Sequence, residues 1–140
     1  MVPKPNVTDR ISVDTSFDNE SSCKRYQGLV EDELKNDAQL FKVNFRENFI
    51  GFFLIKNEEM YSISNLAGIF KEYQKLGFGI CLNYFIIKES QINNRGVLKT
   101  AFSSNNTGAS NIHKTLGFDV YKTLTIFTKN NKFNNEWEFK

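Results

Sequence analysis

Residues 74–79, Gln-Lys-Leu-Gly-Phe-Gly, have the types and spacing of a backbone site for phosphate. Gly77 and Gly79 let the chain turn tightly and leave amide N–H groups unobstructed. An apolar run of helical length begins at Phe78, and the first N–H groups of a helix lack internal partners and carry partial positive charge. The stretch therefore predicts a cradle for phosphate or pyrophosphate, although an ordinary strand-to-helix turn would use the same residues.

A second stretch, residues 105–118, reads Asn-Asn-Thr-Gly-Ala-Ser-Asn-Ile-His-Lys-Thr-Leu-Gly-Phe. Together the two stretches resemble the signatures of the GNAT superfamily of acyl-CoA-dependent N-acetyltransferases. The first is similar to that family's pyrophosphate loop, Gln/Arg-x-x-Gly-x-Gly/Ala. The second is similar to its Asn-led helix, which ends in an aromatic residue, a basic residue and Leu-Gly-Phe. The order and separation of the motifs also fit, and the resemblance covers roughly residues 41–129.

The resemblance implies an α/β (α+β) fold of GNAT type, a mixed central sheet flanked by helices, here with a shortened N-terminal part. It also implies acetyl-CoA as the acetyl donor. The pantetheine arm would pair with the strand edge at residues 67–69, and the thioester carbonyl would lie at the N–H near Ile69. Gln74 would begin the pyrophosphate cradle, with a solvated turn residue as the alternative. The residues expected to bind the cofactor are Ala67, Gly68, Ile69, Gln74, Lys75, Leu76, Gly77, Phe78, Gly79, Ile80, Asn106, Ala109 and His113.

Three positions of the second motif have alternative interpretations. Asn106 matches the family Asn that contacts the pantetheine arm, and Asn also caps helices without any ligand. Ala109 matches a small position that permits close packing beside the cofactor. His113, the only histidine of the chain, stands where the family has the Tyr that protonates the departing thiolate. An imidazole can donate a proton near neutral pH, but this one could equally fill space or lie on the helix surface.

The other catalytic assignments are weaker. Tyr121 is the substitute acid if His113 is inert, and a core tyrosine of a strand is the alternative for it. No general base is assigned. The candidates near the strand before the loop are Glu58, Glu59, Ser62 and Ser64, although Glu58 and Glu59 fall in a turn, where solvated charges are more common. Glu72 is next to the cradle, where the family often has an acidic residue without a chemical role.

The elements that must position these residues follow from apolar periodicity. Helical spacing predicts helices over residues 21–35 and 78–90, and a further helix in the second motif. Strands are expected at residues 39–45, 49–56, 60–69, 97–102 and 119–128, and the strand at 49–56 reads as buried on both faces. The core candidates of the helix at 78–90 are Ile80, Cys81, Tyr84, Phe85 and Ile87.

The chain divides into an extended or loop segment at residues 1–20, one GNAT-like acetyltransferase domain at 21–129 and a polar tail at 130–140. At 140 residues it is long enough to bury a single core. Its 18 basic and 16 acidic residues form no basic block, which argues against a nucleic-acid partner. No apolar run could span a bilayer, so no membrane partner is expected.

Cys23 and Cys81 lack metal-ligand or disulfide-scaffold spacing, and the start of the chain lacks a signal-peptide core. We therefore expect no metal site, a buried thiol at Cys81 and a cytoplasmic location.

The leading interpretation is an acetyl-CoA-dependent N-acetyltransferase that acts on a primary amine. Residues 9–18 resemble the segment that precedes the catalytic domain in acetyltransferases of amino-sugar nucleotides, and Lys42, Arg46 or Lys56 could then bind the diphosphate. A peptide or protein N-acetyltransferase is the rival. From another class comes a noncatalytic acyl-CoA-binding or interaction module, which the missing family Tyr favours. A homodimer through the last strand or the aromatic tail also stays open.

Overall fold

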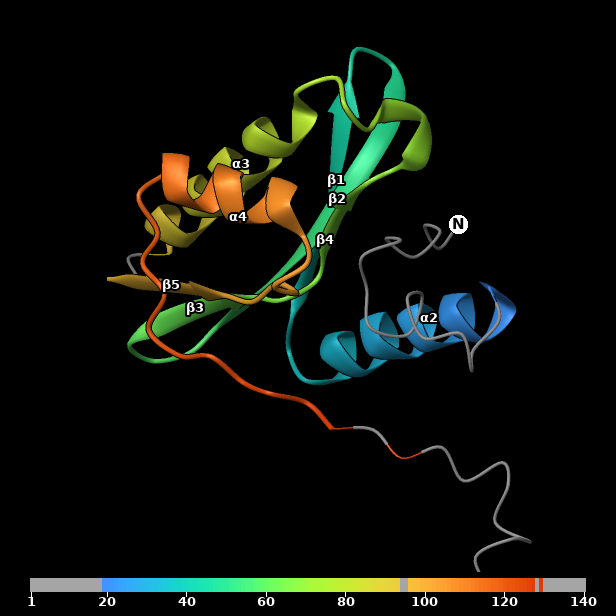
Figure 1. The fold of residues 1–140 in the computed structure, drawn as a ribbon. Coiled ribbons are helices and arrows are strands. Elements are labelled where there is room, and N and C mark those ends of the chain that lie inside the picture. Colours follow the sequence, from blue (N-terminus) through green and yellow to red (C-terminus); the bar gives the residue numbers. More distant parts are fainter. Residues whose placement is uncertain (1–18, 94–95, 128, 130–140) are drawn as a thin grey trace, which may run out of the picture.

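The computed structural model describes residues 19–93, 96–127 and 129 (Figure 1). The two long predicted helices and the first two predicted strands are confirmed, with ends that differ by a few residues at most. Residues 1–18 of the predicted N-terminal segment and the whole tail at residues 130–140 lie outside the described residues. The elements are α2 (Asn19–Lys35), β1 (Gln39–Phe45), β2 (Asn48–Asn57), β3 (Tyr61–Ser64), β4 (Ala67–Ile69), the short 3-10 helix η1 (Lys71–Tyr73), α3 (Phe78–Ile92), β5 (Val97–Thr100) and α4 (Thr107–Thr115).

The sheet is mixed, with the order β1-β2-β3-β5, and β4 also pairs with β2. Strands β1 and β2 form an antiparallel hairpin, and β3 runs antiparallel to β2 but parallel to β5. The single strand predicted at residues 60–69 is therefore two strands, β3 and β4, which both pair with β2. Lys56 faces Ile63 while Phe52 faces Gly68, so β2 advances four residues where its partner advances five. The extra residue is a bulge between β3 and β4.

The bulge opens the sheet. Ser64 Oγ donates to the Leu54 carbonyl at 2.8 Å, and the Leu54 N–H donates to the Leu66 carbonyl at 2.8 Å, which fixes the two sides of the break. Before the break β3 has β5 on its second side, whereas β4 pairs with β2 alone among the described strands. The second edge of β4 is consequently open toward the side where α3 and α4 lie (Figure 1).

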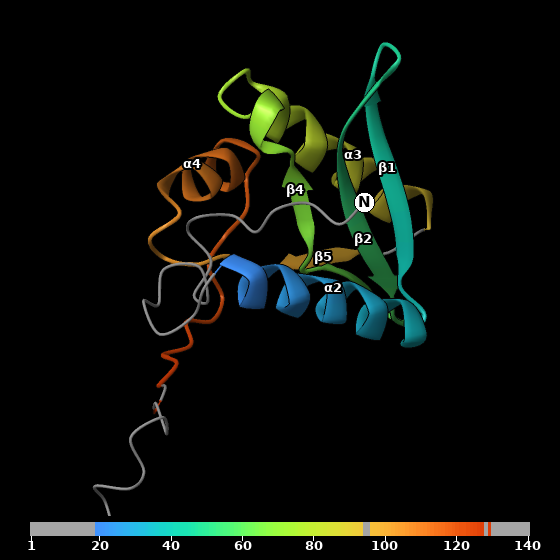
Figure 2. The same ribbon diagram turned by 90° about the vertical axis from the view of Figure 1, so that its right-hand side faces the viewer.

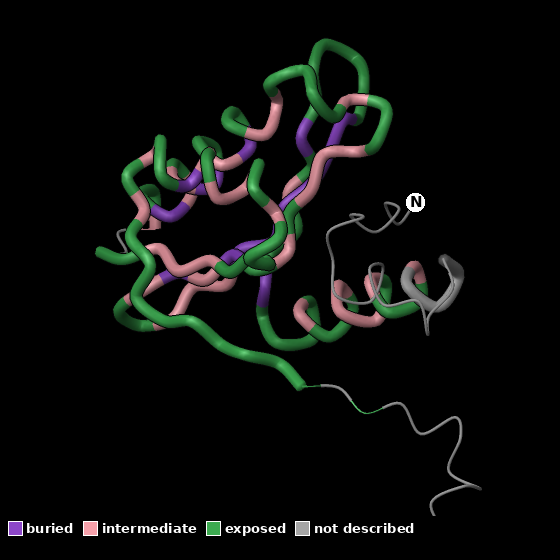
Figure 3. Tube along the Cα trace, viewed as in Figure 1, coloured by how far each residue is buried: buried purple, intermediate pink, exposed green. Residues whose placement is uncertain are grey.

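Helices cover both faces of the β1–β2 region, with α2 on one face and α3 on the other (Figure 2). Strand β2 supplies both cores, because successive side chains point to opposite faces. Phe53 and Ile55 belong to the cluster that includes Leu82 and Ile86 of α3. Phe52 and Leu54 form the other cluster with Ala38, against which Val30 of α2 packs. The buried positions thus follow β2 and one side of α3 (Figure 3), which confirms the prediction of a doubly buried strand.

The predicted core face of α3 is wrong. Leu82, Ile86 and Ser90 are its buried residues, four positions apart, and Phe78 packs against the same cluster. The expected core residues Ile80, Cys81, Tyr84 and Phe85 are exposed, and Ile87 is half-buried. Cys81 is therefore an exposed free thiol and not a buried one.

The predicted strand at 119–128 is also wrong over its described part, since residues 119–127 form no regular element. After α4 this segment runs away from the sheet (Figure 1). Its apolar side chains stay exposed: Val120, Tyr121, Leu124, Ile126 and Phe127. Alternation provides an apolar face, but a strand also needs an edge with which to pair. The predicted strand at 97–102 likewise ends at Thr100.

No described helix has the length and apolarity that a membrane span requires.

Candidate functional site

The glycine loop has the backbone shape of an anion cradle. Gly77 caps α3 at φ 86° and ψ 0°, in the left-handed region that favours glycine, and Lys75 has φ 64°. No side chain caps this helix, so the amides of its first turn keep their donors available. A Cβ at Gly77 would meet nothing within 4 Å, so conformation rather than space requires glycine there. The residues predicted to hold pyrophosphate thus surround an uncapped helix N-terminus.

Gln74 connects this loop to the sheet. Its Nε2 donates to the Ile69 carbonyl at 2.9 Å, from an exposed position. The side chain is thereby not a free turn residue, and its part in the cradle stays a prediction. It fixes the loop to the end of β4, where the cofactor arm is expected.

The open edge of β4 presents backbone groups from alternate residues. The Phe70 N–H donates to the Ile50 carbonyl at 2.9 Å, and the Leu54 bond to Leu66 lies four residues back along the same ladder. Because antiparallel ladders alternate, Ala67 and Ile69 direct their N–H groups away from β2. Gln74 already occupies the Ile69 carbonyl. The Ile69 N–H is therefore a donor at the edge next to the glycine loop, as the resemblance implies.

Sequence reasoning missed the glycine that brings these strands together. A Cβ at Gly51 of β2 would overlap the Gly68 carbonyl oxygen and the Ile69 side chain. A Cβ at Gly68 would only make an ordinary contact, 3.7 Å from the Phe52 ring. Close approach is thus required on β2, and only the strand register could have shown it.

The two motifs meet where α4 packs on α3. A Cβ at Gly79 would lie 2.9 Å from Ile112 Cδ1, so Gly79 lets α4 come close to the first turn of α3. Asn106 caps α4, because its Oδ1 accepts the Ala109 N–H at 3.0 Å. The capping interpretation of Asn106 is confirmed, and its contact with a cofactor stays a prediction. Ala109 is half-buried.

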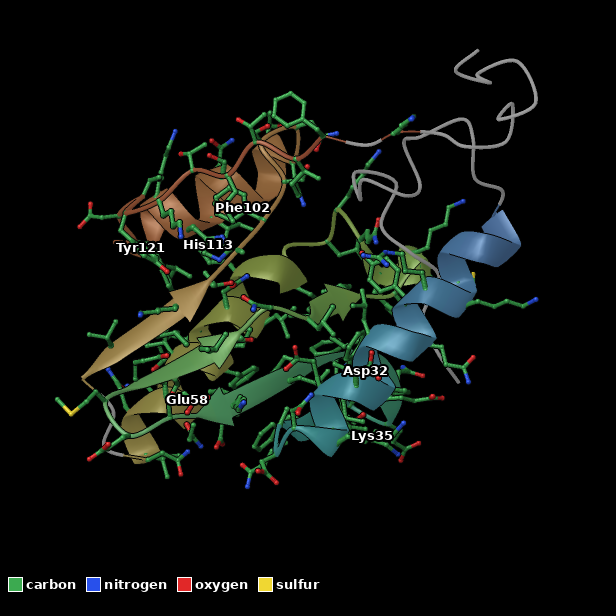
Figure 4. All side chains as sticks on the ribbon, turned by 90° about the horizontal axis from the view of Figure 1, so that it is seen from below. Asp32, Lys35, Glu58, Phe102, His113 and Tyr121 are labelled. Carbon is green, nitrogen blue, oxygen red and sulfur yellow. The ribbon has the colours of Figure 1, made fainter. Side chains whose placement is uncertain are left out.

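His113 is enclosed in the molecule, so the surface alternative is wrong. His113 lies on the side of α4 that faces the sheet (Figure 4), and it is only 7% exposed. Nδ1 lies 2.7 Å from the Ala109 carbonyl oxygen. The ring lies between Phe102 and Phe118, with centroid distances of 4.8 Å and 4.9 Å. Nε2 is buried and has no hydrogen-bond partner.

Tyr121 lies in a different environment. It is 72% exposed in the segment after α4, so the core-strand alternative is wrong for it. Its described contact is with Lys99 of β5, whose Nζ lies 5.6 Å from the ring centroid. The structure thus places the two proposed acids in an enclosed and an open setting, and only His113 is sequestered from water (Figure 4).

The hydroxyls and one carboxylate considered as bases have partners. Ser62 Oγ donates to Asn57 Oδ1 at 2.6 Å, and Ser64 Oγ donates to the Leu54 carbonyl. Glu58 pairs with Lys56 at 3.1 Å at the β2–β3 turn, the other end of β2 from the glycine loop. The hydrogen bond and charge of Glu58 raise the pKa of Lys56.

Glu59 and Glu72 are exposed, and Glu72 is in η1 just before the loop. Among the described residues, no group of His, Cys, Asp and Glu side chains could hold a metal ion.

Two cations lie at the loop end of the sheet. The Arg46 guanidinium is 5.3 Å from the centroid of Phe45, which packs on Phe78 at the start of α3 with centroids 5.0 Å apart. Lys42 Nζ lies 5.5 Å from the Phe49 ring. Arg46 therefore lies near the N-terminus of α3. Lys42 faces Phe52 across the hairpin and so lies on the α2 side of the sheet, and Lys56 is held at the opposite end of β2.

No protein-family model and no curated protein sequence matches the chain. Solved structures do match it. AAC(6')-Iy, an aminoglycoside N-acetyltransferase, in complex with the bisubstrate analogue CoA-S-monomethyl-acetylneamine gives a TM-score of 0.57 at 14% identity, over 76% of this chain and 80% of that one. A GNAT family acetyltransferase from Elizabethkingia anophelis with acetyl-CoA bound gives a TM-score of 0.60 at 14% identity, over 79% of this chain and 69% of that one. The ribosomal-protein-S18-alanine N-acetyltransferase from Escherichia coli gives a TM-score of 0.56 at 17% identity, over 64% of this chain and 60% of that one. At these identities the similarity shows the fold, and the chain has the fold of the GNAT N-acetyltransferases.

Proposed function

We propose that this protein is an acetyl-CoA-dependent N-acetyltransferase that acts on a primary amine. One observation carries the proposal: the uncapped N-terminus of α3 lies beside the open edge of β4, and Gln74 holds the two together. A helix N-terminus binds the phosphates of a nucleotide, and an open strand edge pairs with an amide-containing chain. Two of the similar structures hold a CoA moiety or acetyl-CoA, which supports this choice of ligand.

The chain's own groups fit acetyl-CoA, which supplies the activated acetyl group when bound. The amides of Phe78, Gly79 and Ile80 would hold the pyrophosphate, and those of Ala67 and Ile69 would hold the arm. The Ile69 N–H would polarise the thioester carbonyl, because a fixed donor stabilises the negative charge that develops on that oxygen. Helix α4, which carries His113, packs on the first turn of α3 beside these amides.

For the acceptor we propose an amino-sugar nucleotide. Arg46 lies near the N-terminus of α3 and could bind its diphosphate, whereas Lys42 is on the α2 side of the sheet and Lys56 is engaged by Glu58. The resembling segment at residues 9–18 lies outside the described residues. A peptide N-terminus is the rival acceptor, since one similar structure is a ribosomal-protein-alanine N-acetyltransferase.

The test is release of free thiol from acetyl-CoA with a panel of amino-sugar nucleotides, aminoglycosides and peptides, with mass spectrometry of the acetylated product. We expect amine-dependent thiol release that is largest for an amino-sugar nucleotide. Preference for peptides would contradict the acceptor but keep the chemistry. Tight acetyl-CoA binding with no thiol release from any amine would favour the noncatalytic acyl-CoA-binding module.

We further propose a cytoplasmic enzyme that forms a homodimer. Cys23 and Cys81 are free thiols, in keeping with a reducing compartment. The segment at residues 119–127 exposes apolar side chains that a second copy could cover.

A further inference from the structure

We propose that His113 acts first as the general base and then as the general acid of the acetyl transfer. This inference rests on the proposed function and assigns the base that the sequence leaves open. It differs from the role of a tyrosine at the same position, because a neutral tyrosine can only donate its proton.

That hydrogen bond fixes the tautomer. The Ala109 carbonyl oxygen, 2.7 Å from Nδ1, can only accept, so Nδ1 must carry the hydrogen. In the neutral ring Nε2 then has a lone pair and no hydrogen. Such a ring cannot protonate a thiolate until it has first taken up a proton at Nε2. The base step therefore has to precede the acid step.

The surroundings of Nε2 leave its lone pair unused. Nε2 is buried without a partner, and the two rings that flank the imidazole belong to Phe102 and Phe118. An unsatisfied buried acceptor is costly, so a native structure keeps one where it serves a purpose or is met by a ligand. Phe102, one of these two rings, is 39% exposed, so the imidazole lies directly behind a ring that reaches the surface.

The proton balance closes on this one nitrogen. As the amine nitrogen bonds to the thioester carbon, its N–H proton passes to Nε2 and gives an imidazolium. The C–S bond then breaks, and its electron pair leaves on sulfur. The imidazolium returns the proton from Nε2 to the thiolate. The products are the amide, the thiol and the neutral imidazole, with Nδ1–H bonded to Ala109 throughout.

The described contacts of the imidazole include no charged group. They are the two phenyl rings and the Ala109 carbonyl. Lys114 and Asp119, the charged residues nearest along the chain, are exposed, and Lys99 of β5 lies over the rings of Tyr61 and Tyr121. A protonation change detected at this site would therefore belong to His113 and not to a neighbouring charged group.

The first test does not depend on the amine. His113 is the only histidine, so nitrogen-15 NMR of the imidazole gives one pair of signals without assignment. We expect a protonated Nδ1 and an unprotonated Nε2 in the neutral form, and a shift of Nε2 when acetyl-CoA is added. A neutral ring with the hydrogen on Nε2 would overturn the proposal.

The second test separates base from acid. His113→Tyr restores a proton donor and His113→Gln keeps an acceptor, but neither can take up and return a proton at neutral pH. We expect both to lower kcat/KM by about 10²-fold or more, the usual range for losing a general acid–base group, with a far smaller change in the dissociation constant for acetyl-CoA. We also expect the acidic limb of the wild-type pH profile to coincide with the NMR titration of His113. Asn111→Gln, at an exposed position of the same helix, is the control.

The outcomes distinguish the two proposals. A His113→Tyr variant as active as the wild type would show that an acid alone suffices, which overturns this inference and leaves the acetyltransferase intact. A wild type that binds no acetyl-CoA overturns the acetyltransferase, and the base–acid role fails with it.

Discussion

Gln74 connects the glycine loop to the sheet by a hydrogen bond. Its Nε2–H bond to the Ile69 carbonyl joins the start of the loop to the strand edge that would hold the cofactor arm. The donor is a side-chain amide and the acceptor is backbone, so the bond orients the Ile69 peptide while it leaves the Ile69 N–H free for a ligand.

Replacing this amide tests that role. We expect Gln74→Met, which keeps the length but removes the donor, to weaken acetyl-CoA binding about fivefold, which corresponds to a typical hydrogen bond of about 1 kcal/mol. Gln74→Glu should weaken it further, because a carboxylate would face the Ile69 carbonyl. Calorimetric titration of both variants measures this, and wild-type affinity in both would contradict it.

Among the elements, β2 and β4 depend on a close approach that one glycine allows. The structure predicts opposite outcomes for two glycines of this pair, Gly51, which faces Ile69, and Gly68, which faces Phe52. Gly51→Ala would overlap the Gly68 carbonyl oxygen, and we expect it to destabilise the fold by about 1–3 kcal/mol, as overpacking does. Gly68→Ala has room for its Cβ and serves as the matched control. Denaturant unfolding measures both, and equal stabilities would contradict the register.

The sequence predicts α2, β1 and β2 well because each has a clear period and clear ends. The sequence does not show which face of α3 is buried. Apolar residues surround most of the helix between Phe78 and Ile87, so their spacing favours no one face. The bulge after Ser64 and the need for Gly51 depend on which residues face each other across β2.

The glycine loop is predicted well because glycines of this spacing have a local backbone meaning, as Gly77 shows. The burial and tautomer of His113 could not be predicted. They depend on the Ala109 carbonyl and on two phenyl rings that only the fold brings together.

At the scale of the whole molecule, the exposed segment at residues 119–127 is the surface that most needs a partner. Leu124 is 71% exposed, and Val120 and Ile126 of the same segment are exposed as well. We expect Leu124→Lys to abolish a homodimer in light scattering after size exclusion while the free energy of unfolding of the monomer changes by less than about 0.5 kcal/mol.

The control is Ile92→Lys, because Ile92 is equally exposed, at 74%, but lies at the end of α3 outside this segment. A wild type that is monomeric at all concentrations would contradict the dimer. A large loss of stability in Leu124→Lys would instead show that the segment packs on its own chain.

The most direct test of the central claim is calorimetric titration of acetyl-CoA into wild type, Gly77→Asp and Gly96→Asp. At Gly77 the aspartate places an anion where pyrophosphate should bind and strains a backbone at φ 86°. Gly96 is exposed, has open space for a Cβ and precedes β5, so Gly96→Asp matches the change in charge away from the loop. We predict that wild type and Gly96→Asp bind equally and that Gly77→Asp does not bind. Absence of binding to the wild type, or equal binding to Gly77→Asp, would contradict the assignment of the α3 N-terminus as the cofactor site.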